Sequence, residues 1–295
     1  MLNSPEKKAA VLIETLPYIQ QFYGKTVVIK YGGNAMINTE LKNSVIKDII
    51  LMKYVGMRPV VVHGGGPEIT GMLKQLGKQS TFVSGLRVTD AETVAIAEMV
   101  LVGKINTEIV SLLNRRGAKA VGLSGKDADL IVARKHLAQV HENGETREVD
   151  IGFVGDVVKI NTDIINTLLN QGYIPVIAPV GIGKDNDSYN INADYVAGEI
   201  AGALAAEKLM LLTDVEGIYR DYHDKSSFIS TLTFAEAQEM IKHGRIDGGM
   251  IPKVEACIRA LSGGAVKAHI IDGRQSHSLL LEVFTEQGIG SEVVR

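Results

Sequence analysis

The stretch TVVIKYGGN (Thr26–Asn34) is an apolar, β-branched run that ends in a lysine and two glycines. A second stretch, VVVHGGGPEIT (Val60–Thr70), repeats this arrangement, because an apolar run again breaks into glycines immediately before a helix. Glycines at such a turn let the backbone approach a ligand without interference from a Cβ atom. A tight turn explains one such loop. Two of them, with Lys30 at the end of the first run, favour a site for an anionic ligand.

Short apolar runs alternate with longer amphipathic stretches along the chain, which is typical of strand–helix–strand units around a parallel sheet. The predicted strands are Val27–Lys30, Pro59–His63, Lys119–Leu123, Ile174–Ala178, Lys208–Thr213 and Ala268–Ile271. Predicted helices include Leu41–Val55, Thr89–Leu113 and one that opens with the capping box Thr233–Glu236. The fold class is therefore α/β.

Two segments depart from this alternation. From Leu130 to Ile160 the pattern predicts short alternating strands with Asn143-Gly144 as a hairpin turn, an inserted β segment that covers a site rather than extending the main sheet. Near the N-terminus, Ser4-Pro5 starts an amphipathic helix that Pro17 ends or kinks. An apolar stripe along this helix consists of Val11, Leu12, Leu16, Ile19 and Phe22.

Composition narrows the class of protein. The 295 residues fit one large α/β domain or two lobes that share a sheet, and a net charge of −3 gives no basic field for nucleic acid or an anionic membrane. No run reaches the roughly 18 apolar residues of a membrane span, and the N-terminus lacks the features of a signal peptide. The one cysteine, Cys257, is predicted to be a small core residue. We expect a cytoplasmic location.

The familiar nucleotide and hydrolase motifs are absent. Gly24-Lys25-Thr26 lacks the glycine that a Walker A loop carries five residues earlier, where Ile19 stands. No G-x-G-x-x-G follows the first strand, and neither H-E-x-x-H nor G-x-S-x-G occurs. His63 is therefore predicted to make local hydrogen bonds rather than bind a metal, and no metal site is predicted.

Three further stretches carry groups suited to anions. GLRVTD places Arg87 before a helix, where a guanidinium fork suits a carboxylate, although an exposed surface arginine is an equally good alternative. YNINAD puts Asn190, Asn192 and Asp194 at a helix start, where they cap the helix or bind a ligand. GRIDGGMIPKVEA places Lys253 in the first turn of a helix, where a cation opposes the helix dipole and calls for a bound anion.

A resemblance to the amino acid kinase family, and within it to the N-acetylglutamate kinases of arginine biosynthesis, is carried by VVIKYGGN, VVVHGGGPEI, GLRVTD, YNINAD, LLTDVEGIY and DGGMIPKV. It implies a three-layer αβα sandwich with a mainly parallel central sheet, a β-hairpin insert and an extra N-terminal helix. It also implies three regions: an oligomerisation helix (1–22), a lobe for N-acetylglutamate binding and dimerisation (23–205), and a lobe for ATP and arginine (206–295).

The implied activity is transfer of the γ-phosphoryl group of ATP to the γ-carboxylate of N-acetyl-L-glutamate. A carboxylate is already a nucleophile, so the enzyme has to align two anions and neutralise charge on the equatorial oxygens. Mg²⁺ is expected on the ATP phosphates, since no carboxylate cage is visible. Three alternatives stay open: a sibling kinase acting on another small carboxylate or carbamate, a catalytically inactive arginine sensor, and a plain nucleotide-binding module.

The resemblance also implies roles for individual residues. The catalytic residues are Lys30, Lys253 and Asp194, the last of which holds the two ammonium groups in place. The phosphoryl group is contacted by Gly32, Gly33, Gly65 and Gly66. The substrate is bound by Gly65, Gly66, Arg87, Asn190 and Asn192. The nucleotide is bound by Thr213, Asp214, Gly217 and Lys253.

Both ends of the chain resemble the arginine-inhibited members of the family, whose N-terminal helix interlaces between dimers to form a hexamer, a trimer of dimers. The alternative is that this helix packs only on its own domain. The residues expected to bind L-arginine are Tyr18, His277, Glu282, Gly288 and Gly290. Glu282 suits a guanidinium, and Tyr18 closes the pocket. Some relatives also bind a PII signal protein, and no residue decides whether this chain does.

Overall fold

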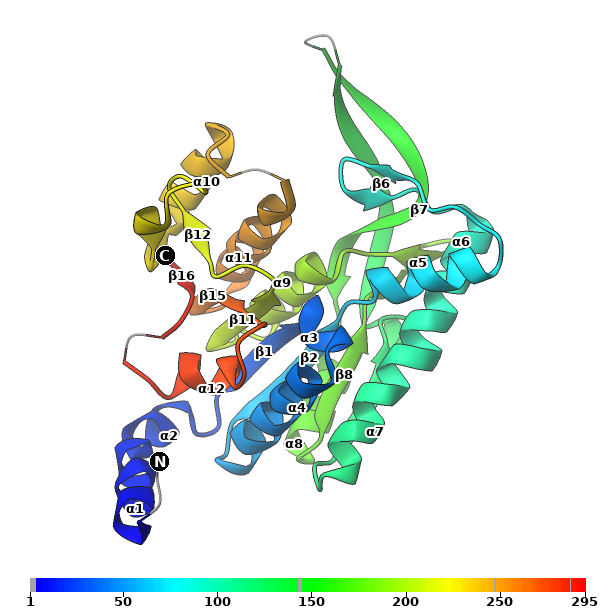
Figure 1. The fold of residues 1–295 in the computed structure, drawn as a ribbon. Helices are drawn as coiled ribbons and strands as arrows, with labels where there is room; N and C mark the ends of the chain where they lie inside the picture. Colours follow the sequence, from blue (N-terminus) through cyan, green and yellow to red (C-terminus); the bar gives the residue numbers. More distant parts are fainter. Residues whose placement is uncertain (1–3, 143–144, 247, 287) are drawn as a thin grey trace.

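A computed structural model describes residues 4–142, 145–246, 248–286 and 288–295, and its centre is an eight-stranded sheet (Figure 1). In spatial order the strands are β14 (Thr231–Thr233), β16 (Ser291–Val294), β15 (Lys267–Asp272), β11 (Lys208–Thr213), β1 (Thr26–Tyr31), β2 (Arg58–His63), β8 (Ile174–Ala178) and β5 (Ala120–Ser124). The six predicted strands are confirmed, and they are parallel to one another. The antiparallel pairing of this sheet joins β15 to β16.

Helices cover both faces of the sheet, which confirms the three-layer αβα architecture. One face carries α4 (Thr39–Tyr54), α5 (Gly66–Gln75), α7 (Thr107–Arg115) and α12 (Ser278–Val283). The other carries α8 (Asp163–Asn170), α9 (Ala193–Ala203), α10 (Phe234–Lys242) and α11 (Ile251–Gly263). Successive residues of β1 therefore enter different cores, because Val27 and Ile29 face the first layer and Val28 faces the second. Strands buried on both faces explain the uninterrupted apolar runs of the sequence.

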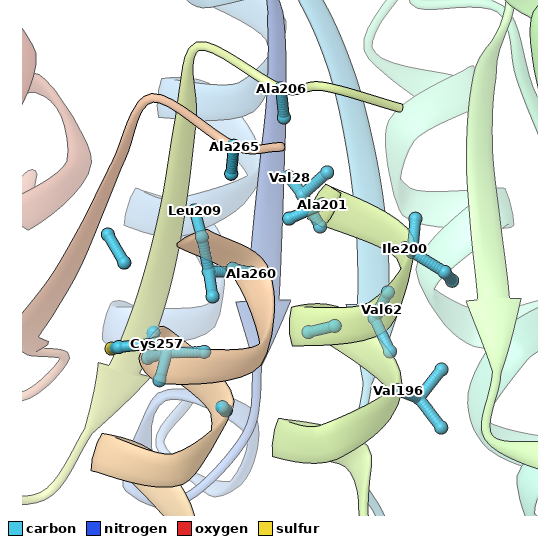
Figure 2. Packing of buried hydrophobic residues seen from close by; sticks show 14 of the residues in the cluster. Val28, Val62, Val196, Ile200, Ala201, Ala206, Leu209, Cys257, Ala260 and Ala265 are labelled. Carbon is cyan, nitrogen blue, oxygen red and sulfur yellow. The ribbon is translucent and has the colours of Figure 1, made fainter. Parts of the chain in front are cut away.

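The second layer is packed closely because α9 and α11 touch through glycines. A Cβ atom on Gly198 would lie 2.5 Å from the carbonyl oxygen of Ala256, and one on Gly202 would lie 2.9 Å from Gly263 Cα. Figure 2 shows both helices over β1, β2 and β11, with the predicted core residue Cys257 among the buried side chains. This contact fixes the first turns of α9 and α11 relative to each other.

The predicted helix Thr89–Leu113 is interrupted. It consists of α6 (Ala91–Glu98), the π-helix η1 (Met99–Asn106) and most of α7. A π-helix bonds residue i to i+5, so its turn is wider than that of an α-helix, and such segments are frequent at functional sites. The other predicted helix, Leu41–Val55, is α4, and the Thr233–Glu236 capping box is confirmed at the start of α10.

The inserted segment was predicted as short strands, and this is wrong. It forms two long antiparallel strands, β6 (Ile131–Glu142) and β7 (Glu145–Ile160), which project from the body in Figure 1. The predicted turn Asn143-Gly144 lies outside the described residues. As expected, the insert does not extend the main sheet, because it forms a small barrel with β9 (Val180–Ile182) and β10 (Ser188–Asn190).

The remaining elements are short. They are α3 (Asn34–Ile37), β3 (Phe82–Val83), β4 (Leu86–Arg87), β12 (Ile218–Tyr219), β13 (Phe228–Ile229), and the 3₁₀ turns η2 (Asp127–Asp129), η3 (Lys225–Ser227) and η4 (Gly248–Met250). Among the described residues, no helix combines the length and apolar character needed to cross a membrane.

The N-terminal segment forms two helices, α1 (Pro5–Glu14) and α2 (Leu16–Phe22). Ser4 caps α1 and Pro17 lies in the first turn of α2, so both predicted boundaries are confirmed. The predicted apolar stripe meets the rest of the domain at its end, where Phe22 is buried. Leu12 is 70% exposed, and no residue of α1 is buried.

Candidate active site

The two glycine loops lie side by side because they follow neighbouring parallel strands. In the register of β1 and β2, Tyr31 is opposite His63, and the N–H of Gly64 donates to the carbonyl oxygen of Tyr31 at 2.9 Å. The loops therefore meet at the carboxyl edge of the sheet, where parallel α/β proteins bind ligands. Lys30, the last residue but one of β1, extends into this edge.

Two lysines face one buried carboxylate. Lys30 Nζ lies 3.0 Å from Asp194 Oδ1, and Lys253 Nζ lies 3.1 Å from Asp194 Oδ2. Burial raises the pKa of the Asp194 carboxyl, but attraction to the two ammonium groups outweighs it, so the pKa is lowered from its usual range. Asp194 is therefore ionised and leaves a net positive charge at the centre of the site. We call these three residues the lysine clamp.

Each member of the lysine clamp comes from a different element. Lys30 is on β1, Asp194 is in the first turn of α9, and Lys253 is in the first turn of α11. Asn192 caps α9 and accepts a hydrogen bond from the N–H of Asp194 at 2.8 Å. Since α9 and α11 are locked together through their glycines, the two helix starts hold the carboxylate and the second lysine in fixed relation.

Two cavities meet at the lysine clamp. The first has a volume of about 270 Å³, and the second about 400 Å³. The residues common to both linings are Lys30 and Gly33. Predicted residues that line only the first are Gly32, Gly65, Gly66, Arg87, Asn190, Asn192 and Asp194, and those that line only the second are Thr213, Asp214, Gly217 and Lys253. The insert reaches the first cavity through Val154 of β7.

Arg87 is buried, which overturns the alternative of a surface arginine. It is 7% exposed, and burial lowers the pKa of its guanidinium. Its Nη1 donates to Ser80 Oγ at 2.5 Å, and its Nη2 donates to Thr70 Oγ1 at 2.8 Å and to the Gly66 carbonyl oxygen at 3.0 Å. The Phe82 ring covers the guanidinium at 4.8 Å. A cation held this firmly is suited to bind a carboxylate.

Sequence reasoning missed the residues that support Arg87. Phe82 begins a short hairpin, β3–β4, whose turn is Ser84-Gly85 with positive φ at both residues, and Ser80 lies two residues before it. A Ser-Gly pair between apolar residues is a recognisable turn signal. It could have indicated a hairpin immediately before Arg87. Tyr219 and Tyr222, which line the second cavity, were missed as well.

The residues predicted to bind arginine are only partly together. Glu282 is buried on α12, and its Oε2 accepts from the N–H groups of Ile289 and Gly290 at 2.8 and 3.3 Å. A Cβ on Gly288 would lie 2.8 Å from the same oxygen. Tyr18 packs edge-on against Phe284, the residue that follows the end of α12.

His277 points elsewhere, and a different histidine lies against Glu282. His277 Nδ1 is 2.5 Å from Asp48 Oδ1, whereas His269 Nδ1 is 2.7 Å from Glu282 Oε1. Lys208 Nζ lies 3.2 Å from His269 Nε2 and can only donate, so His269 is neutral and carries its proton on Nδ1, the nitrogen that faces Glu282. Burial raises the pKa of Glu282, but His269, the Ile289 N–H and Lys208 together outweigh it, so the pKa is lowered. His269 was missed because it lies within β15, outside any motif.

Comparisons with known proteins agree with this geometry. The model of the amino acid kinase family matches residues 25–272. The chain is 62% identical to acetylglutamate kinase of Moorella thermoacetica, covering 100% of this chain and 99% of the relative. A relative from Pelotomaculum thermopropionicum with the same name is 59% identical and covers 99% of each chain.

Among solved structures, N-acetylglutamate synthase from Neisseria gonorrhoeae complexed with coenzyme A and N-acetyl-glutamate has a TM-score of 0.82 at 27% identity, and the match covers 97% of this chain and 63% of that one. The same synthase complexed with coenzyme A and L-arginine has a TM-score of 0.78 at 26% identity, covering 97% and 65%. The full-length matches and the shared fold lead to one conclusion. The chain belongs to the amino acid kinase family.

Proposed function

We propose that this chain transfers the γ-phosphoryl group of ATP to the γ-carboxylate of N-acetyl-L-glutamate, a step of arginine biosynthesis. The observation that carries the proposal is the meeting of two cavities at Lys30 and Gly33. A transfer reaction needs two ligands whose reacting atoms come together at one point. The acetylglutamate kinases at 56–62% identity over nearly the whole chain supply the identity of both ligands.

The first cavity is assigned to the acceptor. Arg87 binds its α-carboxylate, and Asn190 and Asn192 bind its amide region. The second cavity is assigned to ATP. With the shared Lys30 and Gly33 set aside, every residue that lines the first cavity lies within 23–205 and every residue that lines the second lies within 206–295, which supports the two proposed lobes.

The lysine clamp supplies the catalysis. The acceptor carboxylate attacks the γ-phosphorus directly, so no general base is required. Lys30 and Lys253 neutralise charge that develops on the equatorial oxygens, and Asp194 keeps the two ammonium groups from moving apart. Gly32, Gly33, Gly65 and Gly66 supply backbone contacts, since no Cβ separates their N–H groups from the phosphoryl oxygens.

In this proposal Mg²⁺ binds as a complex with ATP. In the described ranges, no group of three or more His, Cys, Asp and Glu side chains could hold a metal ion. Mg²⁺ is typically bound by substrate phosphates and one or two carboxylates, and Asp214 lines the second cavity within reach of that role. The ion supplies charge neutralisation on the phosphates when it is bound.

A direct assay tests the activity. The full chain is incubated with MgATP and, in separate reactions, N-acetyl-L-glutamate, L-glutamate, L-aspartate and carbamate, and acyl phosphate or ADP is measured. We expect turnover with N-acetyl-L-glutamate alone. Faster turnover with another acceptor would transfer the assignment to a sibling kinase. Arginine binding without turnover of any acceptor would support the inactive sensor instead.

Inhibition by L-arginine is the second part of the proposal. Glu282 is a buried carboxylate beside His269, near Tyr18 of the N-terminal segment, and the synthase that shares this fold was solved with L-arginine. The exposed stripe on α1 offers a surface for a second copy, in keeping with a hexamer built from dimers. A coupling of about 1–3 kcal/mol between the two sites is enough for clear feedback inhibition.

Two variants separate assembly from arginine binding. Deletion of residues 1–15 removes α1 but keeps buried Phe22, and we expect active dimers that arginine inhibits weakly. Glu282→Gln keeps the shape of the side chain, and we expect hexamers that arginine inhibits weakly. Dimers of the intact chain in sedimentation, or an unchanged rate in millimolar arginine, would remove the regulatory proposal and leave the kinase assignment in place.

A further inference from the structure

His63 and Asn106 form a buried pair behind the second glycine loop. His63, the last residue of β2, is 0% exposed, and Asn106, the last residue of η1, is 3% exposed. Asn106 Nδ2 lies 3.1 Å from His63 Nε2 and 2.9 Å from the carbonyl oxygen of Val176. His63 Nδ1 lies 2.9 Å from the carbonyl oxygen of Gly64. The chain of contacts thus runs from β8 to the loop that lines the first cavity.

The chemistry of these groups permits one arrangement of protons. The Val176 carbonyl oxygen can only accept, so the amide nitrogen of Asn106 must face it. The second hydrogen of that nitrogen then points to His63 Nε2, which must accept. The imidazole proton is therefore on Nδ1, where it donates to the Gly64 carbonyl oxygen. Burial lowers the pKa of His63 to about 4, which keeps the ring neutral.

Fixing the Gly64 carbonyl also fixes the next N–H group. In a trans peptide, the carbonyl of one residue and the N–H of the next are coplanar and point in opposite directions. The Gly64 carbonyl points to the buried His63 ring, so the Gly65 N–H points away from the interior. Gly65 lines the first cavity, and within the described part of the chain its N–H makes no hydrogen bond. The Gly64 N–H is held separately by Tyr31.

The π-helix explains how Asn106 reaches this position. A Cβ on Gly65 would lie 2.4 Å from Ile105 Cδ1 and 2.7 Å from Leu101 Cδ2, so η1 already packs against the loop through these two residues. In an α-helix, a residue five positions after Leu101 would be rotated by roughly 140° from it. The i to i+5 spacing of a π-helix brings Asn106 back toward the face of Leu101.

We propose that His63 and Asn106 are positioning residues for phosphoryl transfer, which set the Gly64–Gly65 peptide so that the Gly65 N–H points at the transferred group. This rests on the proposed kinase function. Neither residue touches the substrate. Their effect therefore falls on kcat, because a donor aimed at the transition state contributes to the chemical step more than to binding.

The test compares two replacements of His63 that each keep one ring nitrogen. The amide nitrogen of Asn occupies the place of Nδ1. His63→Asn therefore still donates to the carbonyl oxygen of Gly64 but loses the hydrogen bond with Asn106. Gln places its terminal amide near the position that Nε2 occupies in the wild type. His63→Gln therefore keeps the hydrogen bond with Asn106 but loses the one to the carbonyl oxygen of Gly64. We expect His63→Asn to stay within about threefold of wild-type kcat and His63→Gln to fall about tenfold or more. The melting temperature should be higher for His63→Gln than for His63→Asn, since Gln fills the space of the imidazole ring better.

Asn106→Ala should lower kcat by about tenfold while KM for ATP changes less than twofold. Its matched control is Asn114→Ala, because Asn114 lies in the adjoining helix α7 and also bonds strand backbone, with Ala120 at 2.7 and 3.2 Å, but has no link to the glycine loop. The control should keep wild-type kcat. Equal losses of kcat in both variants, or a kcat for His63→Gln that matches His63→Asn, would overturn the proposal.

A measurement without turnover separates this proposal from the kinase assignment. The ¹⁵N chemical shifts of the His63 ring in the intact chain report which nitrogen is protonated. We expect a proton on Nδ1 alone, with loss of this preference in Asn106→Ala. A proton on Nε2 in the wild type would overturn the proposal even if the chain phosphorylates N-acetyl-L-glutamate. Failure of the acceptor assay with the expected ring state would instead count against the proposed function.

Discussion

The two glycine loops look alike in sequence, but different forces support them. In the first loop the glycines leave room for charged groups: a Cβ on Gly32 would lie 2.8 Å from Lys30 Nζ, and one on Gly33 would lie 2.7 Å from Asp214 Oδ1. In the second loop, Gly65 leaves room for the apolar ends of Leu101 and Ile105, and a neutral histidine holds the backbone. The first loop thus places charge, whereas the second places a peptide group.

The largest expected effect tests the charged loop. Lys30→Ala and Lys253→Ala should each lower kcat by roughly a hundredfold or more, the scale for removal of one preorganised group that stabilises the transition state. Both variants should fold, because Asp194 keeps one lysine partner in each. Steady-state kinetics and circular dichroism measure the two properties.

The matched control for the lysine variants is Lys25→Ala. Lys25 precedes β1 at the opposite end of the strand and pairs with Glu207 at the surface. An exposed pair of this kind contributes little to stability, so kcat and melting temperature should both stay near wild type. Near-normal turnover of folded Lys30→Ala or Lys253→Ala would refute the lysine clamp.

The next effect distinguishes the loops directly. Gly65→Ala forces a methyl group into Ile105 and Leu101 and should lower the free energy of unfolding by about 1–3 kcal/mol, the usual cost of overpacking. Gly32→Ala meets only the flexible end of Lys30, so it should lower kcat with little change in stability. Denaturant unfolding and kinetics of both variants check this.

A second substitution tests whether the methyl group of Gly65→Ala is destabilising because it meets Ile105. Ile105→Val removes the Cδ1 atom that the new methyl group would meet, so the double variant should recover part of the lost free energy of unfolding. If the losses of unfolding free energy in Gly65→Ala and Ile105→Val simply add in the double variant, Gly65 does not pack against Ile105 in the way proposed.

Acid stability tests the neutral histidine. The pKa of His63 is lowered from 6.5 to about 4, so the unfolded chain binds the proton more readily than the folded one between these values. Stability from this residue is complete above pH 6.5 and is lost as the pH falls toward 4, by about 2 kcal/mol between pH 7 and pH 5. The free energy of unfolding of His63→Asn should therefore vary less over this range. Parallel pH curves for the two proteins would contradict the assignment.

The smallest expected effect concerns the acceptor. Arg87→Lys replaces a fork that holds Ser80, Thr70 and Gly66 by a single ammonium group. KM for N-acetyl-L-glutamate should rise by roughly tenfold, with KM for ATP little changed. The comparison is Arg245→Lys, on the second cavity, which should leave the KM of the acceptor unchanged. A rise in the KM for ATP in Arg87→Lys would move Arg87 to the nucleotide side.

The sheet and the edge at which the site lies could be predicted from sequence because they depend on local signals. Strands buried on both faces appear as unbroken apolar runs, and residues at strand ends or helix starts, such as Lys30 and Asp194, necessarily lie at one edge of a parallel sheet. The division of the predicted residues between the two cavities was implied by the resemblance to the kinase family and not by these local signals. Their roles in binding and catalysis stay predictions until the assays are made.

Features that depend on distant contacts could not be predicted. The π-helix keeps the residue types of an α-helix, and only its packing against Gly65 reveals why the turn widens there. His269 and His277 lie eight residues apart, and the resemblance to arginine-inhibited relatives indicated His277, whereas the sheet orients His269 toward Glu282. The lengths of β6 and β7 depend on their pairing with each other, which alternation in sequence underestimates.

The exposure of α1 has a consequence for hydrogen exchange. None of its ten residues is buried, and a helix of this length is marginal on its own in water. Its amide protons should exchange rapidly in an isolated chain, whereas those of α4, which packs on the sheet in the first helical layer, should exchange slowly. Slow exchange in α1 therefore requires a second copy to cover it. Dilution that accelerates exchange in α1 alone would measure the affinity between copies without any labelled partner.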